Sequence, residues 1–278
     1  MAKLLEGKPI AQGLKESLKY QVQCLNIKPV LASIQVGENA GAVSYVKSQR
    51  QAAENLGIVY QMYKLADEIT KEELVSFIQE LNSDTSVHGI IIQMPLHSRI
   101  DYKSLSQFIL PEKDAEGIHP VNIGKILFGQ SKVLPCTPAA VMELLKETGI
   151  DLYGKEVVVV GHSEIVGKPL ALLLLDKFAT VTICHIGTSQ AGKLEEHVRQ
   201  AEVLIVAVGK AGLIKGEWIK DSAVVIDVGI NRIGDKIVGD VEFEEAAKRA
   251  SWITPVPGGV GPLTVVMLMR NVVEAAKL

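Results

Sequence analysis

The chain has 278 residues, which is enough for one large domain or two of ordinary size. Its composition, 47% hydrophobic and 22% charged, is typical of a soluble globular protein and excludes a largely disordered chain. The formal net charge of −3 and the lack of a basic arm argue against a nucleic-acid partner.

The three cysteines, Cys24, Cys136 and Cys184, are odd in number, widely spaced and in no metal-ligand pattern. We interpret them as buried or free thiols in a reducing compartment and expect no metal site. The N-terminus has no apolar segment of signal-peptide length, and no apolar run approaches a membrane span. We therefore expect a cytoplasmic protein with no membrane partner.

Helix-type and strand-type patterns alternate along the first half of the chain. Apolar residues recur every three to four positions from Ile10 to Leu25, which predicts a helix. Thr70 and Glu73 have the spacing of a capping box at the start of another helix. The same reasoning predicts strands at 30–36 and 87–93 and a helix at 42–56. This alternation is typical of a parallel sheet covered by helices.

A second alternating series begins after Pro135 and Pro138. The patterns predict helices at 139–148, from 168, at 193–201 and at 265–276, and strands at 156–160, 180–184, 203–208 and 223–228. Such a series is typical of a Rossmann-like, parallel-sheet nucleotide-binding domain. We therefore predict an α/β fold of two domains, with residues 1–135 (plus 264–278) in the first and 136–263 in the second. The C-terminal helix is expected to pack back on the first domain.

A glycine-containing loop, Gly161-His162-Ser163-Glu164-Ile165-Val166-Gly167-Lys168-Pro169, directly follows a strand of four valines and opens a helix. Backbone N–H groups and the dipole at a helix N-terminus attract phosphates. Gly161 permits a tight turn, and Gly167 permits close packing of the helix on the strand. The loop predicts a dinucleotide site, the alternative being a purely structural turn.

A second loop, residues 254–264, contains three prolines and three glycines in eleven residues. Such a segment continues neither a helix nor a central strand, and it holds a rigid backbone that a flat ligand can approach closely. The alternative is a tight connector between two elements. A third segment, Gln93-Met94-Pro95-Leu96, sets a polar side chain just past a buried strand, where it can orient a ligand.

In order and spacing, the segments around Gln93, Gly161 and Pro257 resemble the methylenetetrahydrofolate dehydrogenase/cyclohydrolase family, and the resemblance extends over essentially the whole chain. It implies a folate-site domain and a nucleotide-binding domain, with tetrahydrofolate derivatives bound in the cleft between them. It further implies oxidation of 5,10-methylenetetrahydrofolate to the 5,10-methenyl form by hydride transfer to a nicotinamide. A homodimer and a role in one-carbon metabolism, serving purine, methionine and histidine biosynthesis, are implied in the same way.

The resemblance also assigns site residues. By it, the catalytic residues are Tyr45, Gln49, Gln93 and Glu116. The substrate is expected to contact Tyr45, Gln93, Met94, Pro95, Glu116, Pro257, Gly258, Gly259, Val260 and Gly261. The cofactor is expected to contact Gly161, His162, Ser163, Ile186, Val208 and Ile230.

Two residues depart from the family pattern. Gln49 stands where the Tyr-Val-x-x-Lys motif has the lysine of the cyclohydrolase step, and Glu116 replaces the second acid of K-D-x-D-G. A glutamine donates hydrogen bonds but exchanges no proton near neutral pH. Neither Lys47 nor Arg50 shares the helix face of Tyr45.

These departures predict that the cyclohydrolase step is weak or lost. Hydride transfer needs mainly the alignment of two bound molecules, so the dehydrogenase step is expected to survive. A fully bifunctional enzyme yielding 10-formyltetrahydrofolate is the first alternative. An inactive folate- or nucleotide-binding regulatory protein is the second.

The choice between NADP and NAD stays open at this point. No acid follows the second strand of the nucleotide-binding domain, where a residue reading the ribose is expected. Family members that use NADP carry cationic and serine residues at the positions held here by His162, Ile186 and Gly187. Only His162, Thr188 and Ser189 remain to contact a 2′-phosphate. The resemblance implies NADP, whereas the residues leave NAD open.

Asp227 ends a further predicted strand in the nucleotide-binding domain. Ligands of open α/β sheets lie beyond such strand ends. We nevertheless favour a structural, hydrogen-bonding role for this carboxylate.

Overall fold

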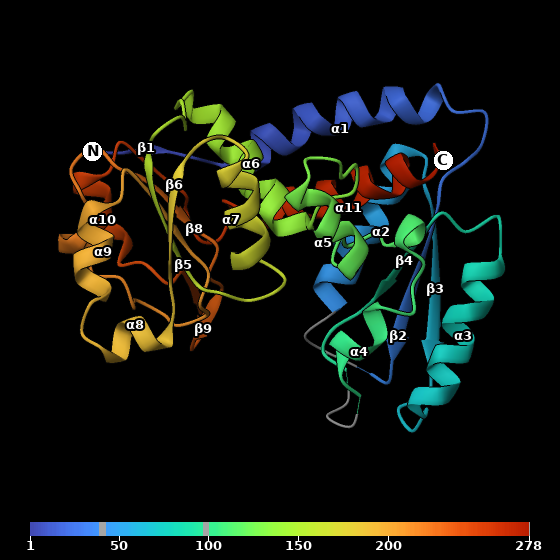
Figure 1. The fold of residues 1–278 in the computed structure, drawn as a ribbon. Helices are drawn as coiled ribbons and strands as arrows, with labels where there is room; N and C mark the ends of the chain where they lie inside the picture. Colours follow the sequence, from blue (N-terminus) through green and yellow to red (C-terminus); the bar gives the residue numbers. More distant parts are fainter. Residues whose placement is uncertain (39–42, 97–99, 278) are drawn as a thin grey trace. The chain divides into compact units, whose positions relative to one another are not determined.

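The computed structural model describes residues 1–38, 43–96 and 100–277 (Figure 1). The chain divides into two compact units. The six-stranded unit comprises Met1–Gln12 and Thr137–Thr264, and the three-stranded unit comprises Gly13–Cys136 and Val265–Leu278. The predicted domain limits differ from these units chiefly in the first twelve residues, which add a short strand to the larger sheet.

The six strands of the larger sheet all run parallel, in the order β1-β11-β8-β7-β5-β6. Its strands are β1 (Lys3–Leu4), β5 (Glu156–Val160), β6 (Thr180–Cys184), β7 (Val203–Val206), β8 (Val224–Asp227) and β11 (Trp252–Ile253). The central strands β5, β7 and β8 read as nearly continuous apolar runs, because helices cover both faces of a parallel sheet. Figure 1 shows α7 on one side of this sheet and α9 and α10 on the other.

The helices of this unit are α6 (Cys136–Thr148), α7 (Gly167–Leu175), α8 (Ile186–Gln190), α9 (Leu194–Gln200), α10 (Phe243–Arg249) and the 3-10 turn η2 (Gly216–Trp218). A small antiparallel hairpin joins β9 (Asn231–Ile233) and β10 (Lys236–Val238).

The strand order creates a topological switch point in this sheet. From β5 the chain moves to β6 on one side and then returns to β7 on the other. The chain segments that follow β5 and β7 therefore lead away from each other, toward β6 and β8 respectively. A crevice opens between them, outside the carboxyl ends of β5 and β7. Ligands of open α/β sheets bind in such crevices.

The three-stranded unit has a parallel sheet in the order β3-β2-β4. Its strands are β2 (Val30–Val36), β3 (Val59–Leu65) and β4 (Gly89–Ile92). Its helices are α2 (Val43–Leu56), α3 (Lys71–Ser83), α4 (Tyr102–Ser106), α5 (Pro120–Leu127) and the 3-10 turn η1 (Pro111–Lys113). Two further helices, α1 (Gly7–Gln23) and α11 (Gly261–Ala275), contribute residues to both units.

The two faces of this smaller sheet differ in character. On one face, alternate residues of β2 such as Ala32 and Ile34 pack in an apolar cluster with Ile78 of α3. The opposite face carries Ser33, a fully buried polar residue in a mostly apolar strand. A hydroxyl buried at this position needs hydrogen-bond partners, which come from Tyr60 on β3 and from Gln93, the residue that follows β4.

Several predictions are confirmed. The α/β fold with a parallel nucleotide-type sheet is present, and strands 30–36, 156–160 and 180–184 have the expected limits. Thr70 and Glu73 form the expected capping box. The first predicted residue of the helix at 42–56 lies outside the described part of the chain, and α2 begins at Val43. The strand expected at 203–208 ends at Val206, which leaves residues 207–210 as a loop.

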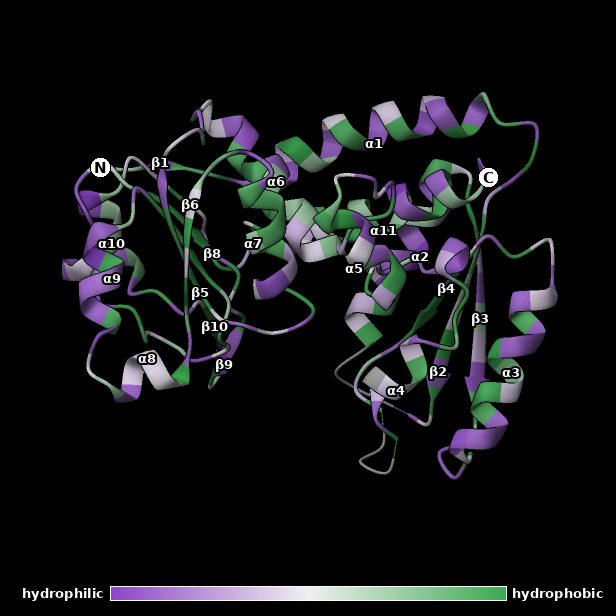
Figure 2. Ribbon diagram, in the orientation of Figure 1, coloured by the Kyte–Doolittle hydropathy of each residue, from purple (hydrophilic) through white to green (hydrophobic). Residues whose placement is uncertain are grey.

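Figure 2 shows hydrophobic residues concentrated on the strands, while α1 alternates between hydrophilic and hydrophobic positions. Across the ranges that the structure describes, no helix has the length and apolar character needed to cross a membrane. The cysteines are free thiols, exposed at Cys24 and buried at Cys184.

Candidate active site

The loop after β5 closes tightly at the switch point. Gly161 adopts a φ of +128°, which side chains of L residues rarely tolerate. A Cβ atom at Gly161 would lie 2.4 Å from the carbonyl oxygen of Ala207, just past β7. A Cβ at Gly167 would lie 2.0 Å from the carbonyl oxygen of Gly161. Both glycines are therefore needed for the backbone to fold back on itself and on the neighbouring strand.

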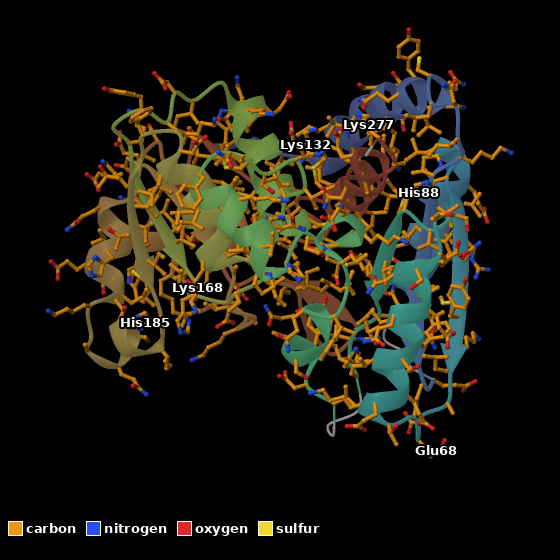
Figure 3. All side chains as sticks on the ribbon, turned by 45° about the vertical axis from the view of Figure 1, so that its right-hand side comes forward. Glu68, His88, Lys132, Lys168, His185 and Lys277 are labelled. Atoms are coloured by element: carbon orange, nitrogen blue, oxygen red, sulfur yellow. The ribbon has the colours of Figure 1, made fainter. Side chains whose placement is uncertain are left out.

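The N-terminus of α7 opens from this loop without a side-chain cap. The hydroxyl oxygen of Ser163 accepts a hydrogen bond from the N–H of Val166 at 3.1 Å, so it shapes the loop. The ammonium of Lys168, labelled in Figure 3, pairs with Glu164 at 3.0 Å on the exposed surface. A bare backbone and an uncapped helix N-terminus suit the phosphates of a dinucleotide. Gly161 and Ser163 thus occupy positions from which they can hold the expected cofactor.

Two histidines follow β5 and β6. The rings of His162 and His185 lie with their centroids 5.2 Å apart. The Nδ1 atom of His185, also labelled in Figure 3, accepts the N–H of Gly187 at 3.1 Å and so caps α8. Ile186, next in sequence, is exposed. The end of β6 therefore offers an imidazole and an aliphatic side chain, and neither an acid nor a permanently charged cation.

Asp240 organises the loop after β7 and was not singled out from the sequence. Its side chain is fully buried. The carboxylate accepts hydrogen bonds from the backbone N–H groups of Val208, Gly209 and Lys210 at 2.8, 2.9 and 2.8 Å, and from Nδ2 of Asn231 at 2.8 Å. One buried anion therefore fixes three consecutive residues of the loop in which Val208 was expected to contact the cofactor.

Asp227 has the structural role that we favoured. Its carboxylate accepts the N–H groups of Gly229, Asp240 and Val241 at 2.9, 3.1 and 2.9 Å. Burial raises the pKa of Asp227 to about 6, and the neighbouring Asp240 adds to the rise while these N–H donors oppose it. The sequence signal that could have revealed this pair of buried acids is the glycine beside them. Only glycine fits at position 239, because a Cβ there would lie 2.0 Å from Oδ2 of Asp227.

The Pro-Gly loop is fixed to neighbouring backbone by hydrogen bonds and close contacts. The hydroxyl oxygen of the buried Thr254 accepts the N–H of Asp227 at 2.7 Å, which ties the start of the loop to the end of β8. The N–H of Gly7 donates to the carbonyl oxygen of Gly258 at 2.9 Å. A Cβ at Gly7 would lie only 1.9 Å from the carbonyl oxygen of Gly259. Backbone packs directly on backbone here, so the loop keeps one shape.

In the three-stranded unit, Gln49 and Gln93 are joined in one buried network. The Nε2 group of Gln93 donates to Oε1 of Gln49 at 2.8 Å and to the hydroxyl oxygen of Ser33 at 3.0 Å. The Tyr60 hydroxyl lies 3.0 Å from Oε1 of Gln49 and 2.9 Å from the hydroxyl oxygen of Ser33. The network therefore draws one residue from each of β2, α2 and β3, together with the residue that follows β4.

This network contains no group that exchanges protons near neutral pH. Burial raises the pKa of the Tyr60 phenol, which therefore keeps its proton. The guanidinium of Arg50 lies 5.7 Å from the centroid of the Tyr60 ring. The Nε2 atom of Gln49 is buried and has no hydrogen-bond partner among the residues that the structure describes.

Glu116 lies in a second polar cluster of the same unit. The hydroxyl of Tyr102 donates a hydrogen bond to its carboxylate. Burial raises the pKa of Glu116 to about 7, the Tyr102 bond opposes this rise, and the charge of Asp114 adds to it. The backbone beside Glu116 is held by α11, since Nδ2 of Asn271 donates to the carbonyl oxygen of Ala115 at 2.9 Å. Glu116 is thus a titratable carboxyl whose pKa lies near neutrality.

The remaining expected residues are distributed as follows. Tyr45 is half exposed on α2, one turn before Gln49 and on the same helix face. Met94 is half exposed beside the buried Gln93. Ile230 is exposed in the six-stranded unit. The structure thus bonds Gln49 directly to Gln93, whereas Pro257, Gly258, Gly259, Val260 and Gly261 belong to the other unit.

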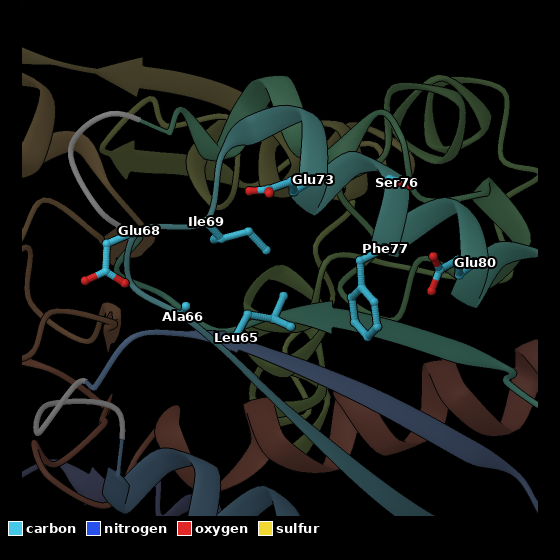
Figure 4. Close-up of a pocket in the computed structure, with 8 residues that line it drawn as sticks. All are labelled: Leu65, Ala66, Glu68, Ile69, Glu73, Ser76, Phe77 and Glu80. Atoms are coloured by element: carbon cyan, nitrogen blue, oxygen red, sulfur yellow. The ribbon is translucent and has the colours of Figure 1, made fainter.

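Each unit has a surface hollow among its described residues. One, of about 570 Å³, runs between the end of β3 and α3 and is lined by Leu65, Ala66, Glu68, Ile69, Glu73, Ser76, Phe77 and Glu80 (Figure 4). It holds none of the expected site residues. The other, of about 480 Å³, lies beside the Asp227 carboxylate in the six-stranded unit. Within the described ranges no group of three or more His, Cys, Asp or Glu side chains is arranged to hold a metal ion.

Comparisons with known proteins agree with the two-part organisation. Residues 5–116 match the model of the tetrahydrofolate dehydrogenase/cyclohydrolase catalytic domain, and residues 135–278 match that of the NAD(P)-binding domain. The "Bifunctional protein FolD" of Acetivibrio thermocellus is 52% identical over 281 residues, covering 100% of this chain and 98% of that protein.

Solved structures agree as well. The bifunctional enzyme FolD of Campylobacter jejuni has a TM-score of 0.96 at 46% identity, covering 100% of this chain and 99% of that one. The methylenetetrahydrofolate dehydrogenase-cyclohydrolase of Trypanosoma brucei, solved with NADP and an inhibitor, has a TM-score of 0.93 at 38% identity, covering 99% and 97%. The chain therefore belongs to the tetrahydrofolate dehydrogenase/cyclohydrolase family.

Proposed function

We propose that this protein oxidises 5,10-methylenetetrahydrofolate to the 5,10-methenyl form by hydride transfer to a nicotinamide dinucleotide, and that its cyclohydrolase step is weak or absent. Family membership supports the dehydrogenase step. One observation supports the loss of the cyclohydrolase step. Gln49, at the position of the family lysine, is bound in a network with Ser33, Tyr60 and Gln93 that contains no group able to exchange a proton near neutral pH.

The chemistry of the first step asks little of the protein beyond positioning. A bound nicotinamide supplies the hydride acceptor. Gly161 and Ser163 would hold its phosphates, and the Val208 loop, fixed by Asp240, would support the nicotinamide end. Gln93, clamped by hydrogen bonds, would orient the reacting ring of the folate. Alignment of two bound molecules supplies most of the rate enhancement in such a step.

Hydrolysis of the methenyl product is a different task. Water must attack the methenyl carbon, and a nearby group must take a proton from it. The amide of Gln49 cannot take a proton, and the Tyr60 phenol keeps its own because its pKa is raised. The methenyl product is therefore expected to leave the enzyme unhydrolysed.

A second candidate function is the complete dehydrogenase/cyclohydrolase that yields 10-formyltetrahydrofolate. The relatives named above are described as bifunctional, which by itself favours this candidate. Glu116 gives it a chemical basis, because a carboxyl with a pKa of about 7 is suited to general base catalysis at neutral pH. The two candidates differ in whether methenyltetrahydrofolate accumulates.

Cofactor choice follows from the residues after β5 and β6. One relative was solved with NADP. In this chain His162 and Ile186 stand at the positions expected to meet the adenosine ribose, and neither is a fixed cation. We therefore expect weak discrimination between NADP and NAD. By family resemblance the enzyme is a homodimer of cytoplasmic one-carbon metabolism that supplies purine, methionine and histidine biosynthesis.

The experiment is a paired assay of purified protein with methylenetetrahydrofolate and either NAD or NADP. Cofactor reduction and methenyl accumulation are followed at their separate absorbances. Methenyl that accumulates in step with reduced cofactor supports the proposal. Reduction without methenyl accumulation supports the bifunctional candidate, and the lack of any reduction would leave only a binding role.

A further inference from the structure

The most unusual polar atom in the three-stranded unit is Nε2 of Gln49. The whole side chain is inaccessible to solvent, and this nitrogen has no partner among the residues described. A buried donor left unpaired loses its hydrogen bonds to water and gains none in the protein, which is unfavourable. Unpaired groups of this kind are rare in native proteins, and each calls for an explanation such as strain, a catalytic role, or a bound water or ion.

The rest of the network explains why the nitrogen is left over. Oε1 of Gln49 receives both the Tyr60 hydroxyl and Nε2 of Gln93, so both of its acceptor positions are used. Turning the Gln49 amide alone would bring two nitrogen donors to within 2.8 Å of each other. With the Gln93 amide oriented as it is, the Gln49 amide therefore keeps its carbonyl oxygen inside the network and its nitrogen outside it.

Tyr60 controls this orientation through a relay of hydroxyl groups. The Tyr60 hydroxyl has one proton and lies within hydrogen-bond distance of two acceptors, the Ser33 hydroxyl oxygen at 2.9 Å and Oε1 of Gln49 at 3.0 Å. The Ser33 hydroxyl can donate to the Tyr60 oxygen, which frees the Tyr60 proton for Gln49. Parallel pairing sets Tyr60 opposite Leu31, two residues from Ser33 on the same face of β2, so the sheet register fixes this geometry.

We propose that Tyr60 and Ser33 are positioning residues that present the Gln49 Nε2 group as a hydrogen-bond donor to the folate substrate, whose ring carbonyl and ring nitrogens are neutral acceptors. This inference rests on the proposed folate site and gives Gln49 a role of its own, beyond the loss of a lysine. Because Gln49 is fully buried, the groups that cover its nitrogen must shift when the substrate binds, and the substrate then supplies the hydrogen-bond partner that this donor lacks.

The first test is Tyr60→Phe, which keeps the ring and removes only the hydroxyl. Tetrahydrofolate, added without a nicotinamide cofactor, is titrated by calorimetry, and KM and kcat are measured with methylenetetrahydrofolate. We expect binding to weaken about five- to tenfold, the equivalent of one hydrogen bond, and the folate KM to rise alike with little change in kcat or in the cofactor KM. Tyr63→Phe is the matched control, because that hydroxyl lies on the same strand and bonds only Gln61, at 2.9 Å, among the residues described.

The second test is Gln49→Glu, which keeps an acceptor oxygen toward Tyr60 and Gln93 and loses the donor when it ionises. Because position 49 is fully buried, the pKa of a glutamic acid there is raised toward neutrality. Compared with the wild type, tetrahydrofolate binding by this variant should therefore fall at least about fivefold more at about pH 8 than at about pH 6. The Tyr60 phenol does not mask this, since burial raises its pKa and it keeps its proton at both pH values. Glu116 titrates in both proteins, so the wild-type comparison removes its effect.

Unchanged folate binding in Tyr60→Phe would overturn the inference, even if the variant were less stable. So would an equal loss of binding in Tyr63→Phe, or a loss in Gln49→Glu that is the same at both pH values. A wild-type protein that binds tetrahydrofolate with the expected dependence on Tyr60 but reduces no cofactor would refute the proposed function and leave this inference standing.

Discussion

Replacing Asp240 by asparagine tests whether one buried carboxylate holds the loop after β7. The carboxylate accepts four hydrogen bonds of 2.8–2.9 Å, two at each oxygen. An amide keeps one of these oxygens and turns an NH2 group toward the two donors that had bonded the other. Two hydrogen bonds to a charged group are lost, at about 1.5–3 kcal/mol each, while the repulsion between Asp240 and Asp227 disappears.

The net loss should be about 3 kcal/mol of unfolding free energy, out of the roughly 5–15 kcal/mol that stabilises a typical protein. Both tryptophans, Trp218 and Trp252, lie in the six-stranded unit, so urea unfolding followed by their fluorescence reports on this unit directly. Affinity for the dinucleotide, measured on the folded variant, should fall as well, because the Val208 loop loses its anchor.

Asp235→Asn is the control, since this residue is exposed in the turn between β9 and β10. It should change the unfolding free energy by less than about 0.5 kcal/mol. A loss below about 1 kcal/mol in Asp240→Asn, or an equal loss in both variants, would refute the anchoring role of Asp240.

Three further predictions concern the expected site. Gln49→Lys restores a proton-exchanging amine and should raise methenyl hydrolysis above the wild-type rate; a stopped assay that detects no gain would mean that another group already does the work or that the site is compromised elsewhere. The Glu116 carboxyl, with its pKa raised from 4.5 to about 7, holds a proton in the folded state that unfolding releases, so stability should fall by about 3 kcal/mol as pH rises through this window. Urea unfolding at several pH values should show that Glu116→Gln removes most of this dependence, and an unaltered slope would exclude the assignment. Gly161→Ala sets a Cβ 2.4 Å from the Ala207 carbonyl oxygen and should weaken dinucleotide binding at least about tenfold. The control Gly124→Ala, at a position with open space around it, should leave binding unchanged. Equal effects of the two substitutions in a fluorescence titration would contradict the assignment of the Gly161 loop to the dinucleotide site.

The parts of the fold that were predictable from the sequence carry strong local signals. The valine-rich strand before Gly161 and the Thr70 capping box each contain the information that specifies them within a few residues. The helix–strand alternation was sufficient for the α/β class, because parallel strands need crossover helices. The two loops rich in glycine were recognisable because few other residues fit their backbones.

The parts that sequence analysis missed depend on contacts between distant residues. Asp240 binds backbone groups 30 to 32 residues earlier in the chain, and an exposed aspartate after the hairpin would have looked the same in sequence. Strand β3 lies at the edge of its sheet with a mostly half-exposed pattern, so it has no clear apolar run. Without β3 and its register, neither Tyr60 nor Ser33 could be connected to Gln49.

The choice between a single and a double activity is tested most directly by the fate of methenyltetrahydrofolate. Purified protein is supplied with methenyltetrahydrofolate alone, and its decay is compared with the decay in buffer. The account predicts equal rates for the wild type, while the same preparation reduces cofactor when given methylenetetrahydrofolate. Faster decay in the presence of the wild-type protein would contradict the account and establish that the cyclohydrolase step survives without the family lysine.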